Sequence, residues 1–380
     1  MRSLGTLDPY MVFLNHGSYG ATPRPVQAEQ QRWRELMEAQ PVRFMVAHAP
    51  REIRRAADSL AAFLGAAGQD IGFVENATAG VTAVLRSFDF KAGDEVITTD
   101  HVYNAVRNTL HHRLEAAGAR LVTVELGMPT PSAGDTHDRV MAAVSPATRM
   151  IVIDHVASFS AAVLPVGEIA KSARARGVAV LVDGAHGPGL LDLDVPALGA
   201  DWYVGNCHKW LCAPKGAGFL WAAPARQGGL HPPVISHALD QGFAAEFDMV
   251  GTRDASAWLS VPAAIAMHQD LGGAELRARN RAVALDAGGR LAERWGTSLG
   301  AAPAQFGGMI TVRIPGGLPP GREHAERLRR WAWDEKRVEL VVSAFEDAHW
   351  LRLSVPAYIS AEDCAAAGPA IEAGLKALTS

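Results

Sequence analysis

One lysine of the sequence lies in surroundings suited to covalent chemistry. Lys209 belongs to the segment GNCHKW (205–210), which follows a strand-like apolar run. A lysine amine attacks an aldehyde to form a Schiff base only when it is uncharged, which requires a desolvated pocket. Four other lysines lie in polar or helical surface contexts, and Lys215 lies in a Pro/Gly-rich segment that is typical of a turn. Most lysines are solvated surface cations, but this context favours Lys209 as a Schiff-base lysine.

An acidic residue ends another apolar run upstream. Asp183 lies in VDGAH (182–186), where a carboxylate is costly unless it meets a cation or hydrogen-bond donors. Pyridoxal 5′-phosphate (PLP) forms a Schiff base with lysine, and its pyridine nitrogen must stay protonated for the ring to accept electrons. We therefore expect Asp183 to pair with that nitrogen and His186 to hydrogen-bond the phenolic oxygen of the ring. From this motif alone, a capping or metal-binding role for Asp183 stays open.

A strand-to-helix junction could hold the phosphate of such a cofactor. The segment ENATAG (75–80) begins a helix, and the free N–H groups from Ala77 onward, with the Thr78 hydroxyl, form a phosphate cradle. A helix cap without a ligand is the alternative. The sequence has no GxGxxG after a strand and no GxxxxGK[ST], so nucleotide-binding functions lack their motifs.

Two aromatic residues and one arginine complete the candidate site. His101 and Tyr103, in DHVYNA (100–105), follow a strand, and one of them either stacks on the PLP ring or only packs. Arg352 is the only charge in the strand-like run LRLSVPAY (351–358). A guanidinium binds a carboxylate through two parallel hydrogen bonds, so Arg352 suits the α-carboxylate of an amino-acid substrate. An edge-strand cation is the alternative.

The elements that must position these residues alternate between strands and helices from residue 50 to about 225. The expected strands are 71–74, 95–98, 121–125, 150–154, 178–183 and 202–205. The expected helices between them include 53–64, 105–117, 138–144 and 166–176. Such units predict an α/β fold with a mostly parallel sheet, and ligands of such sheets bind outside the carboxyl ends of the strands. The candidate residues lie at those ends.

The same patterns predict three parts of the chain. Residues 1–49 form an N-terminal arm and a helix (25–40), and residues 50–274 form a large PLP-binding domain. Residues 275–380 form a smaller α+β domain, with strands at 309–314, 338–342 and 350–355, a helix near 323–334 and a last helix from residue 361.

Composition excludes several classes of function. The net charge of −4 over 380 residues indicates no nucleic-acid partner. No signal peptide and no apolar run long enough for a membrane span is found, so we expect no membrane partner. Three cysteines without CxxC spacing indicate no metal site and no disulfide framework, and they favour the cytoplasm.

Taken together, these motifs resemble the class V branch of the fold-type I PLP enzymes, and within it the isopenicillin N epimerase-like proteins. The matching segments are LNHGSYGATPRPV (14–26), TTDHVYNA (98–105), VDGAHGPG (182–189), GNCHKWLCAPKGAGFL (205–220), DMVGTRDASAWLSVPAA (248–264) and LRLSVPAY (351–358).

The resemblance implies roles for individual residues. Lys209 would hold the cofactor, and the phosphate would be bound by Thr78, Asn206 and His208. Thr252 would reach the phosphate of the neighbouring subunit, which implies a homodimer with shared active sites. The arm that contains Asn15 and His16 would line the substrate pocket, with Arg352 binding the carboxylate.

The reaction expected from this set begins with removal of the α-proton of an amino acid by Lys209. Epimerisation is the first hypothesis and carbon–sulfur lysis the second. A PLP-binding protein without turnover is the third. We do not expect a persulfide-forming cysteine desulfurase, because the stretch 341–350, shortly before Arg352, contains no cysteine that could act as a thiolate nucleophile.

Overall fold

A seven-stranded sheet forms the centre of the large domain. The computed structural model describes residues 5–379. The sheet has the order β2-β8-β7-β6-β5-β3-β4, and every strand is parallel to the others except β8, which runs antiparallel to β2 and β7. Its strands are β2 (Ile71–Val74), β3 (Glu95–Thr99), β4 (Arg120–Val124), β5 (Thr148–Asp154), β6 (Ala179–Gly184), β7 (Trp202–Asn206) and β8 (Gly218–Ala222).

Helices cover both faces of this sheet because both faces are apolar. Along β5, Met150 and Val152 belong to one hydrophobic cluster, and Ile151 and Ile153 belong to the other. One cluster contains residues of α4 (Ala77–Ser87), α5 (Asn104–Ala117) and α8 (Phe243–Asp248). The other contains residues of α3 (Ala49–Phe63), α6 (Ala133–Ala142), α7 (Val166–Arg174), α9 (Ser256–Leu259) and α10 (Val261–Asp270).

The small domain is built on an antiparallel sheet of order β11-β12-β9. Its strands are β9 (Met309–Arg313), β11 (Val341–Phe345) and β12 (Ala348–Ser354). Its helices are α11 (Ala274–Trp295), α12 (Arg322–Lys336), α13 (Ala361–Ala365) and α14 (Ala367–Thr379).

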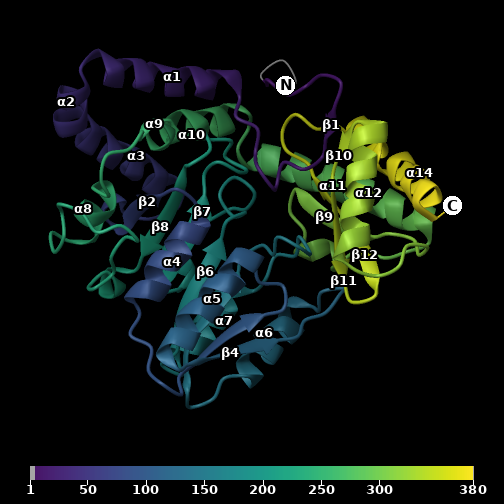
Figure 1. Ribbon diagram of the computed structural model, residues 1–380, viewed down its shortest axis with the longest axis horizontal. Helices are drawn as coiled ribbons and strands as arrows, with labels where there is room; N and C mark the ends of the chain where they lie inside the picture. The colour runs from purple at the N-terminus through teal and green to yellow at the C-terminus, as the bar shows by residue number, and fades with distance from the viewer. Residues whose placement is uncertain (1–4, 380) are drawn as a thin grey trace.

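The N-terminal segment joins the two domains. Helices α1 (Arg24–Ala39) and α2 (Pro41–Arg43) and a π-helical turn (Phe44–His48) lead into α3. The chain before α1 crosses to the small domain, where β1 (Val12–Phe13) pairs in parallel with β10 (Val338–Glu339). Figure 1 shows this purple segment running from α1 at the upper left to the yellow small domain at the right.

The expected fold class, a fold-type I α/β enzyme with a smaller α+β domain, is confirmed. Several details differ. Strands β1 and β8 and helix α8 were not expected, and α6 begins before the predicted helix 138–144. The predicted strand 338–342 is divided between β10 and β11, and the last helix is two helices. The domain boundaries at 49 and 274 stay a prediction. Among the described residues, no helix combines the length and the apolar character that crossing a bilayer requires.

Candidate active site

The carboxyl ends of three neighbouring strands bring the candidate residues together. Pairing of β5 with β6 places Asp154 opposite Asp183, and pairing of β6 with β7 places Gly184 opposite Gly205. Asn206 is the last residue of β7, and Lys209 follows in the turn. The parallel sheet therefore gathers at one edge residues that are widely separated in the sequence.

The Lys209 amine contacts His186, and the neighbouring bonds favour one protonation form of the amine in this contact. The indole N–H of Trp210 donates to Nδ1 of His186 (3.3 Å), so a neutral His186 carries its proton on Nε2. Nε2 lies 3.2 Å from Nζ of Lys209, which can accept that proton only as an uncharged amine. Burial lowers the pKa of Lys209 to about 8, against the opposing effect of Asp183. Lys209 thus has the environment of a nucleophile or a general base.

Two carboxylates beside Lys209 share a buried position. Asp183 and Asp154 are both buried, and Asp183 Oδ1 accepts a hydrogen bond from the Ala185 N–H (3.0 Å). Burial raises the pKa of both carboxyls, and the charge of Asp183 adds to the effect on Asp154. No described residue forms an ion pair with either group, and Oδ2 of Asp154 has no hydrogen-bond partner. A protonated pyridine ring fits this site, because it brings the missing cation.

The start of α4 and the end of β7 form the expected phosphate end. Asn206 Oδ1 accepts from the Ala77 N–H (2.8 Å), and Asn76 caps the helix by accepting from Ala79 N–H (3.0 Å). Within residues 5–379, nothing hydrogen-bonds to the N–H or hydroxyl of Thr78 or to Nδ2 of Asn206, which leaves donors for a phosphate. The Ala77 N–H, in contrast, is already used by Asn206.

His208 reaches the phosphate end with only one ring nitrogen. Its Nδ1–H donates to the Ala217 carbonyl (2.9 Å), so Nε2 can donate to a phosphate only when the ring is an imidazolium. Burial, with the charge of Lys209, lowers the pKa of His208 to about 4. A phosphate dianion beside Nε2 would have to raise that pKa for His208 to take the predicted role.

Arg352 is held in a buried position with one donor left over. Its Nη1 donates to the carbonyl oxygen (2.5 Å) and Oγ (3.2 Å) of Ser158, and its Nη2 donates to Asn15 Oδ1 (3.1 Å) and Ser18 Oγ (2.9 Å). Its Nε is buried without a partner, and burial lowers the pKa of Arg352 to about 10. Only the Nε–H is left for the carboxylate of a ligand, so the two parallel hydrogen bonds expected from the sequence require Arg352 to exchange one of its present Nη bonds.

A cavity of about 1290 Å³ opens beside Arg352. Its walls come from the N-terminal arm, the β3–α5 junction, the β11–β12 hairpin and α12. Tyr103 lines it with 45% of its surface exposed. Burial and the charges of Tyr19 and Asp183 raise the pKa of Tyr103, which keeps the phenol protonated. Of the two aromatic candidates, Tyr103 is the one with its ring open to the cavity.

His101 does not occupy the position expected for a ring that stacks on PLP. Its side chain is fully buried, and its two nitrogens contact Gly127 O (2.9 Å) and Ser160 Oγ (3.0 Å). The edges and faces of its ring meet Phe159 and Phe345 in T-shaped contacts. His101 is among the residues that line the cavity, but its side chain has no exposed surface, whereas a ring that stacks on a cofactor needs an open face.

His16 also lies apart from its expected place, underneath the Lys209 segment. Its Nδ1 contacts the Tyr358 hydroxyl (2.6 Å) and its Nε2 contacts the Lys209 carbonyl (3.0 Å), so both nitrogens are engaged inside the protein. Burial lowers the pKa of His16 to about 3, so the ring is neutral. We propose that it positions Lys209 in place of binding substrate.

Thr252 lines a separate pocket of about 190 Å³. Glu75 lines the same pocket and accepts a hydrogen bond (2.8 Å) from Arg253, the residue after Thr252. The predicted role of Thr252 concerns a second subunit and stays a prediction.

Sequence reasoning missed Asp154 and Ser158. Asp154 had a readable signal, since it ends an apolar strand as Asp183 does; Ser158 had none.

Comparisons with known proteins identify the family of this chain. The family model Aminotransferase class-V matches residues 13–320. Isopenicillin N epimerase of Streptomyces clavuligerus is 34% identical over 97% of this chain and 96% of its own length. A probable chloroplastic L-cysteine desulfhydrase of Arabidopsis thaliana is 32% identical over 88% of this chain and 75% of its own length.

Solved structures share the fold. A complex of the cystine C–S lyase C-DES with its product cysteine persulfide superposes with a TM-score of 0.81, at 22% identity over 96% of this chain and 97% of the other. A C-DES variant with glycine covalently linked to its PLP cofactor superposes with a TM-score of 0.82, at 21% identity over 98% of both chains. With the family match over most of its length and a site that fits the cofactor, the chain belongs to the class V aminotransferase family of PLP-dependent enzymes.

Proposed function

We propose that this enzyme removes the α-proton of an amino acid and returns a proton to the opposite face, as an epimerase. The observation that carries the proposal is the buried Lys209 amine, whose pKa is lowered to about 8 and which contacts His186 and lies close to the buried arginine Arg352. When bound, PLP supplies an electron sink for the charge left on the α-carbon.

The residues divide the remaining work. Arg352 binds the α-carboxylate and thereby orients the α-carbon. Lys209 Nζ takes the α-proton as general base, for which its single lone pair must turn from His186 Nε2–H toward the α-carbon. Asp183 holds a proton on the pyridine nitrogen. Thr78, Asn206 and His208 bind the phosphate, and the contact with His16 keeps the Lys209 backbone in place.

Epimerisation needs a second proton donor, and we assign that role to Tyr103. Its phenol lines the cavity, and its electrostatic neighbours include Asp183 and Arg352. Because its pKa is raised, the phenol carries the proton that the second face of the α-carbon must receive. The same ring is the one available to stack on the cofactor.

The cavity beside Arg352 supports an amino acid larger than cysteine as the substrate. A volume of about 1290 Å³ exceeds the range of about 300–1,000 Å³ that is typical of pockets for drug-sized ligands, whereas cysteine is far smaller than such ligands. Carbon–sulfur lysis stays the second candidate, because relatives such as the A. thaliana protein bear the name L-cysteine desulfhydrase. A PLP-binding protein without turnover is the third.

A desulfurase mechanism stays unexpected, because the thiols are in the wrong places. The hairpin before Arg352 contains no cysteine, and Cys207 and Cys364 are buried. Burial raises the pKa of Cys212 to about 12 and that of Cys364 to about 11, which keeps both thiols protonated.

The experiment is incubation in D₂O with a panel of L-amino acids, D-amino acids and β-thio-substituted amino acids, followed by NMR and chiral chromatography. An epimerase gives the opposite enantiomer with deuterium at the α-carbon. Release of thiol and keto acid would identify the lyase instead, and absence of both products would leave a binding protein. Tyr103→Phe should retain deuterium exchange of one enantiomer while inversion falls about 100-fold or more.

We also propose that the enzyme is a homodimer and is cytoplasmic. The first follows from the resemblance of the segment around Thr252, together with the exposed apolar side chains of Val42 and Val46. The second follows from the free state of the three cysteines, which suits a reducing compartment.

A further inference from the structure

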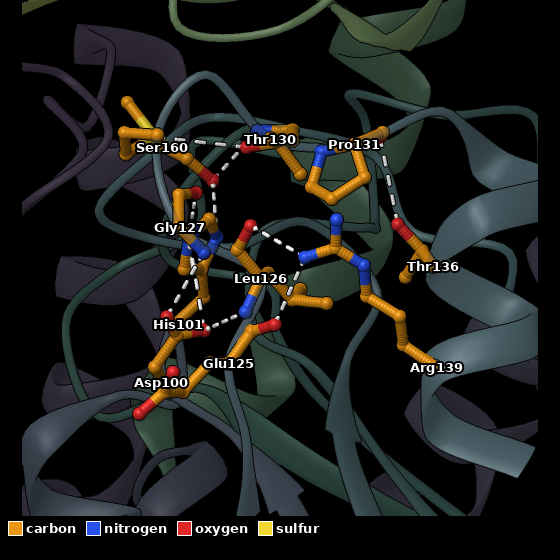
Figure 2. Close-up of polar contacts among 12 residues, drawn as sticks. Asp100, His101, Glu125, Leu126, Gly127, Thr130, Pro131, Thr136, Arg139 and Ser160 are labelled. Atoms are coloured by element: carbon orange, nitrogen blue, oxygen red, sulfur yellow. Dashed lines mark hydrogen bonds and ion pairs between the residues drawn. The ribbon is translucent and has the colours of Figure 1, made fainter. Parts of the chain in front are cut away.

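The imidazole of His101 has a single hydrogen-bonding arrangement. A carbonyl oxygen can only accept, so Nε2–H donates to Gly127 O, and Nδ1 accepts the hydroxyl proton of Ser160. Ser160 Oγ in turn accepts from the Ala162 N–H (3.4 Å). Figure 2 shows His101 between the Gly127 loop and Ser160. The ring therefore ties the β5–α7 loop to the loop after β4.

The Gly127 loop is a fixed anchor for this bond. Both carboxylate oxygens of Asp100 accept main-chain N–H groups of the loop, from Leu126 (2.9 Å) and Gly127 (3.0 Å). Arg139 donates to the carbonyls of Glu125 (3.1 Å) and Leu126 (3.2 Å), as Figure 2 also shows. With its backbone held from two sides, Gly127 fixes the position of His101.

The segment on the other side of His101 holds Arg352. Two residues before Ser160, Ser158 accepts hydrogen bonds from Arg352 Nη1 through both its carbonyl oxygen and Oγ. The Ser160 carbonyl accepts from the Thr311 hydroxyl (2.5 Å), which joins the segment to the small domain. Between the two serines, Phe159 stacks on Phe345 with ring centres 5.0 Å apart.

We propose that His101 is a positioning residue for substrate recognition. By fixing Ser160, it sets the position of Ser158 and, through it, the direction of the Arg352 guanidinium toward the α-carboxylate. The two phenylalanines that meet its ring both line the cavity, so the same contacts shape the cavity wall. This inference rests on the proposed role of Arg352 and extends it to a residue that does not touch substrate.

The test compares glycine with glycinamide as probes. Each is titrated into the PLP-loaded enzyme while the visible absorbance is followed, and the ratio of the two dissociation constants isolates the carboxylate. Glycinamide lacks the carboxylate that accepts a charge-assisted hydrogen bond from Arg352. The wild type should therefore prefer glycine by about tenfold or more. General loosening of the protein would weaken both probes alike and leave this ratio unchanged.

Two substitutions of His101 separate its hydrogen bonds. In His101→Asn the amide overlies Nδ1 and keeps the Ser160 contact, so the ratio should stay within about twofold of wild type. In His101→Gln the amide overlies Nε2 and keeps only the Gly127 contact, so the ratio should fall about threefold to tenfold. Ser160→Ala breaks the same bond without changing His101 and should match His101→Gln. The double variant should be no worse than either single one.

Arg352→Leu distinguishes the proposed role of Arg352 from that of His101. If it abolishes the preference for glycine while His101→Gln and Ser160→Ala leave the ratio unchanged, the role of His101 is refuted and the role of Arg352 stands. If Arg352→Leu leaves the ratio unchanged, the carboxylate assignment fails and this inference fails with it. A loss of cofactor absorbance in both His101 variants, with the ratio intact, would show that His101 serves the cofactor and would also overturn the proposal.

Discussion

At the scale of single residues, the reactivity of Lys209 follows from which neighbouring groups donate hydrogen bonds and which accept them. Trp210 has only a donor to offer, so His186 must accept at Nδ1 and donate from Nε2, and Lys209 must accept as a free amine. This assignment needs no knowledge of the substrate. It explains how a lysine becomes a nucleophile near neutral pH within a protein of net charge −4.

Attachment of PLP to the cofactor-free enzyme should depend on pH with a midpoint near the Lys209 pKa of about 8. The amine reacts and the ammonium does not, so a lowered pKa moves the onset of reactivity to lower pH. The rate should be half-maximal near pH 8 and level off before pH 10. Stopped-flow absorbance measures this rate. Lys215→Ala should behave as wild type and Lys209→Ala should not attach PLP. A rate still climbing at pH 10 would contradict the assignment.

Asp183→Asn should lower α-proton exchange by about 100-fold or more, on the scale of other electrostatic contributions to catalysis. The amide cannot hold a proton on the pyridine nitrogen, although it retains the shape of the carboxylate. NMR in D₂O measures the exchange. Asp192→Asn, at an exposed carboxylate that pairs with Arg277, is the matched control. Near-normal exchange in the Asp183 variant would remove its role.

At the scale of elements, the N-terminal arm contacts the candidate active site. Its residues bond to Arg352, to Glu339 and to the Lys209 carbonyl, and Leu14 O accepts from the Ser354 N–H of β12 (2.9 Å). The arm can approach this closely because of Gly20. A Cβ atom there would lie 2.6 Å from the Lys209 carbonyl oxygen and 2.7 Å from that of His208.

Gly20→Ala should therefore push the arm away from the Lys209 turn. Overpacking against main-chain atoms costs about 1–3 kcal/mol, so we expect a lower Tm and weaker retention of PLP, read by calorimetry and by dialysis. Gly134→Ala is the control, because a Cβ in that exposed turn of α6 meets only Ser132 Oγ at 3.9 Å. Equal behaviour of the two variants would mean that the arm adapts without affecting the site.

At the scale of the whole molecule, the site is formed between two domains and, as we propose, between two subunits. Arg352 and Thr311 come from the small domain, whereas Ser158, Ser160 and Lys209 come from the large one. Movement of one domain relative to the other would move the carboxylate-binding group relative to the base.

The enzyme should sediment as a dimer, and Val42→Asp with Val46→Asp should weaken it. These side chains are 78% and 73% exposed in a single chain, and a charge in an apolar interface is strongly unfavourable. Monomeric protein should also lose activity, because Thr252 could no longer reach the partner's site. The double alanine variant serves as control, and a fully active monomer would refute the dimer.

Much of the fold was open to prediction because it is local. The period of apolar residues indicated the alternating strands and helices, and the rule for parallel sheets located the ligand edge. Lys209, Asp183 and Arg352 could be singled out as candidates because each is an ionisable group in an apolar run, where burial is costly unless the group has a partner. Strand β8 was not predicted, because the position of a short antiparallel strand inside a parallel sheet depends on the strands that pair with it.

Tertiary structure alone decided which candidates meet. Arg352 and Ser158 are 194 positions apart, and His16 and Lys209 are 193 positions apart; such contacts have no local signature. His101 and Tyr103 look alike in the sequence, yet one ring is enclosed by two phenylalanines while the other faces the cavity. By itself, the sequence determined which chemistry the chain carries, because that depends on residue type and burial. Packing between distant segments determined which candidate side chains face the site, because the direction of a side chain is set only when both domains are in place.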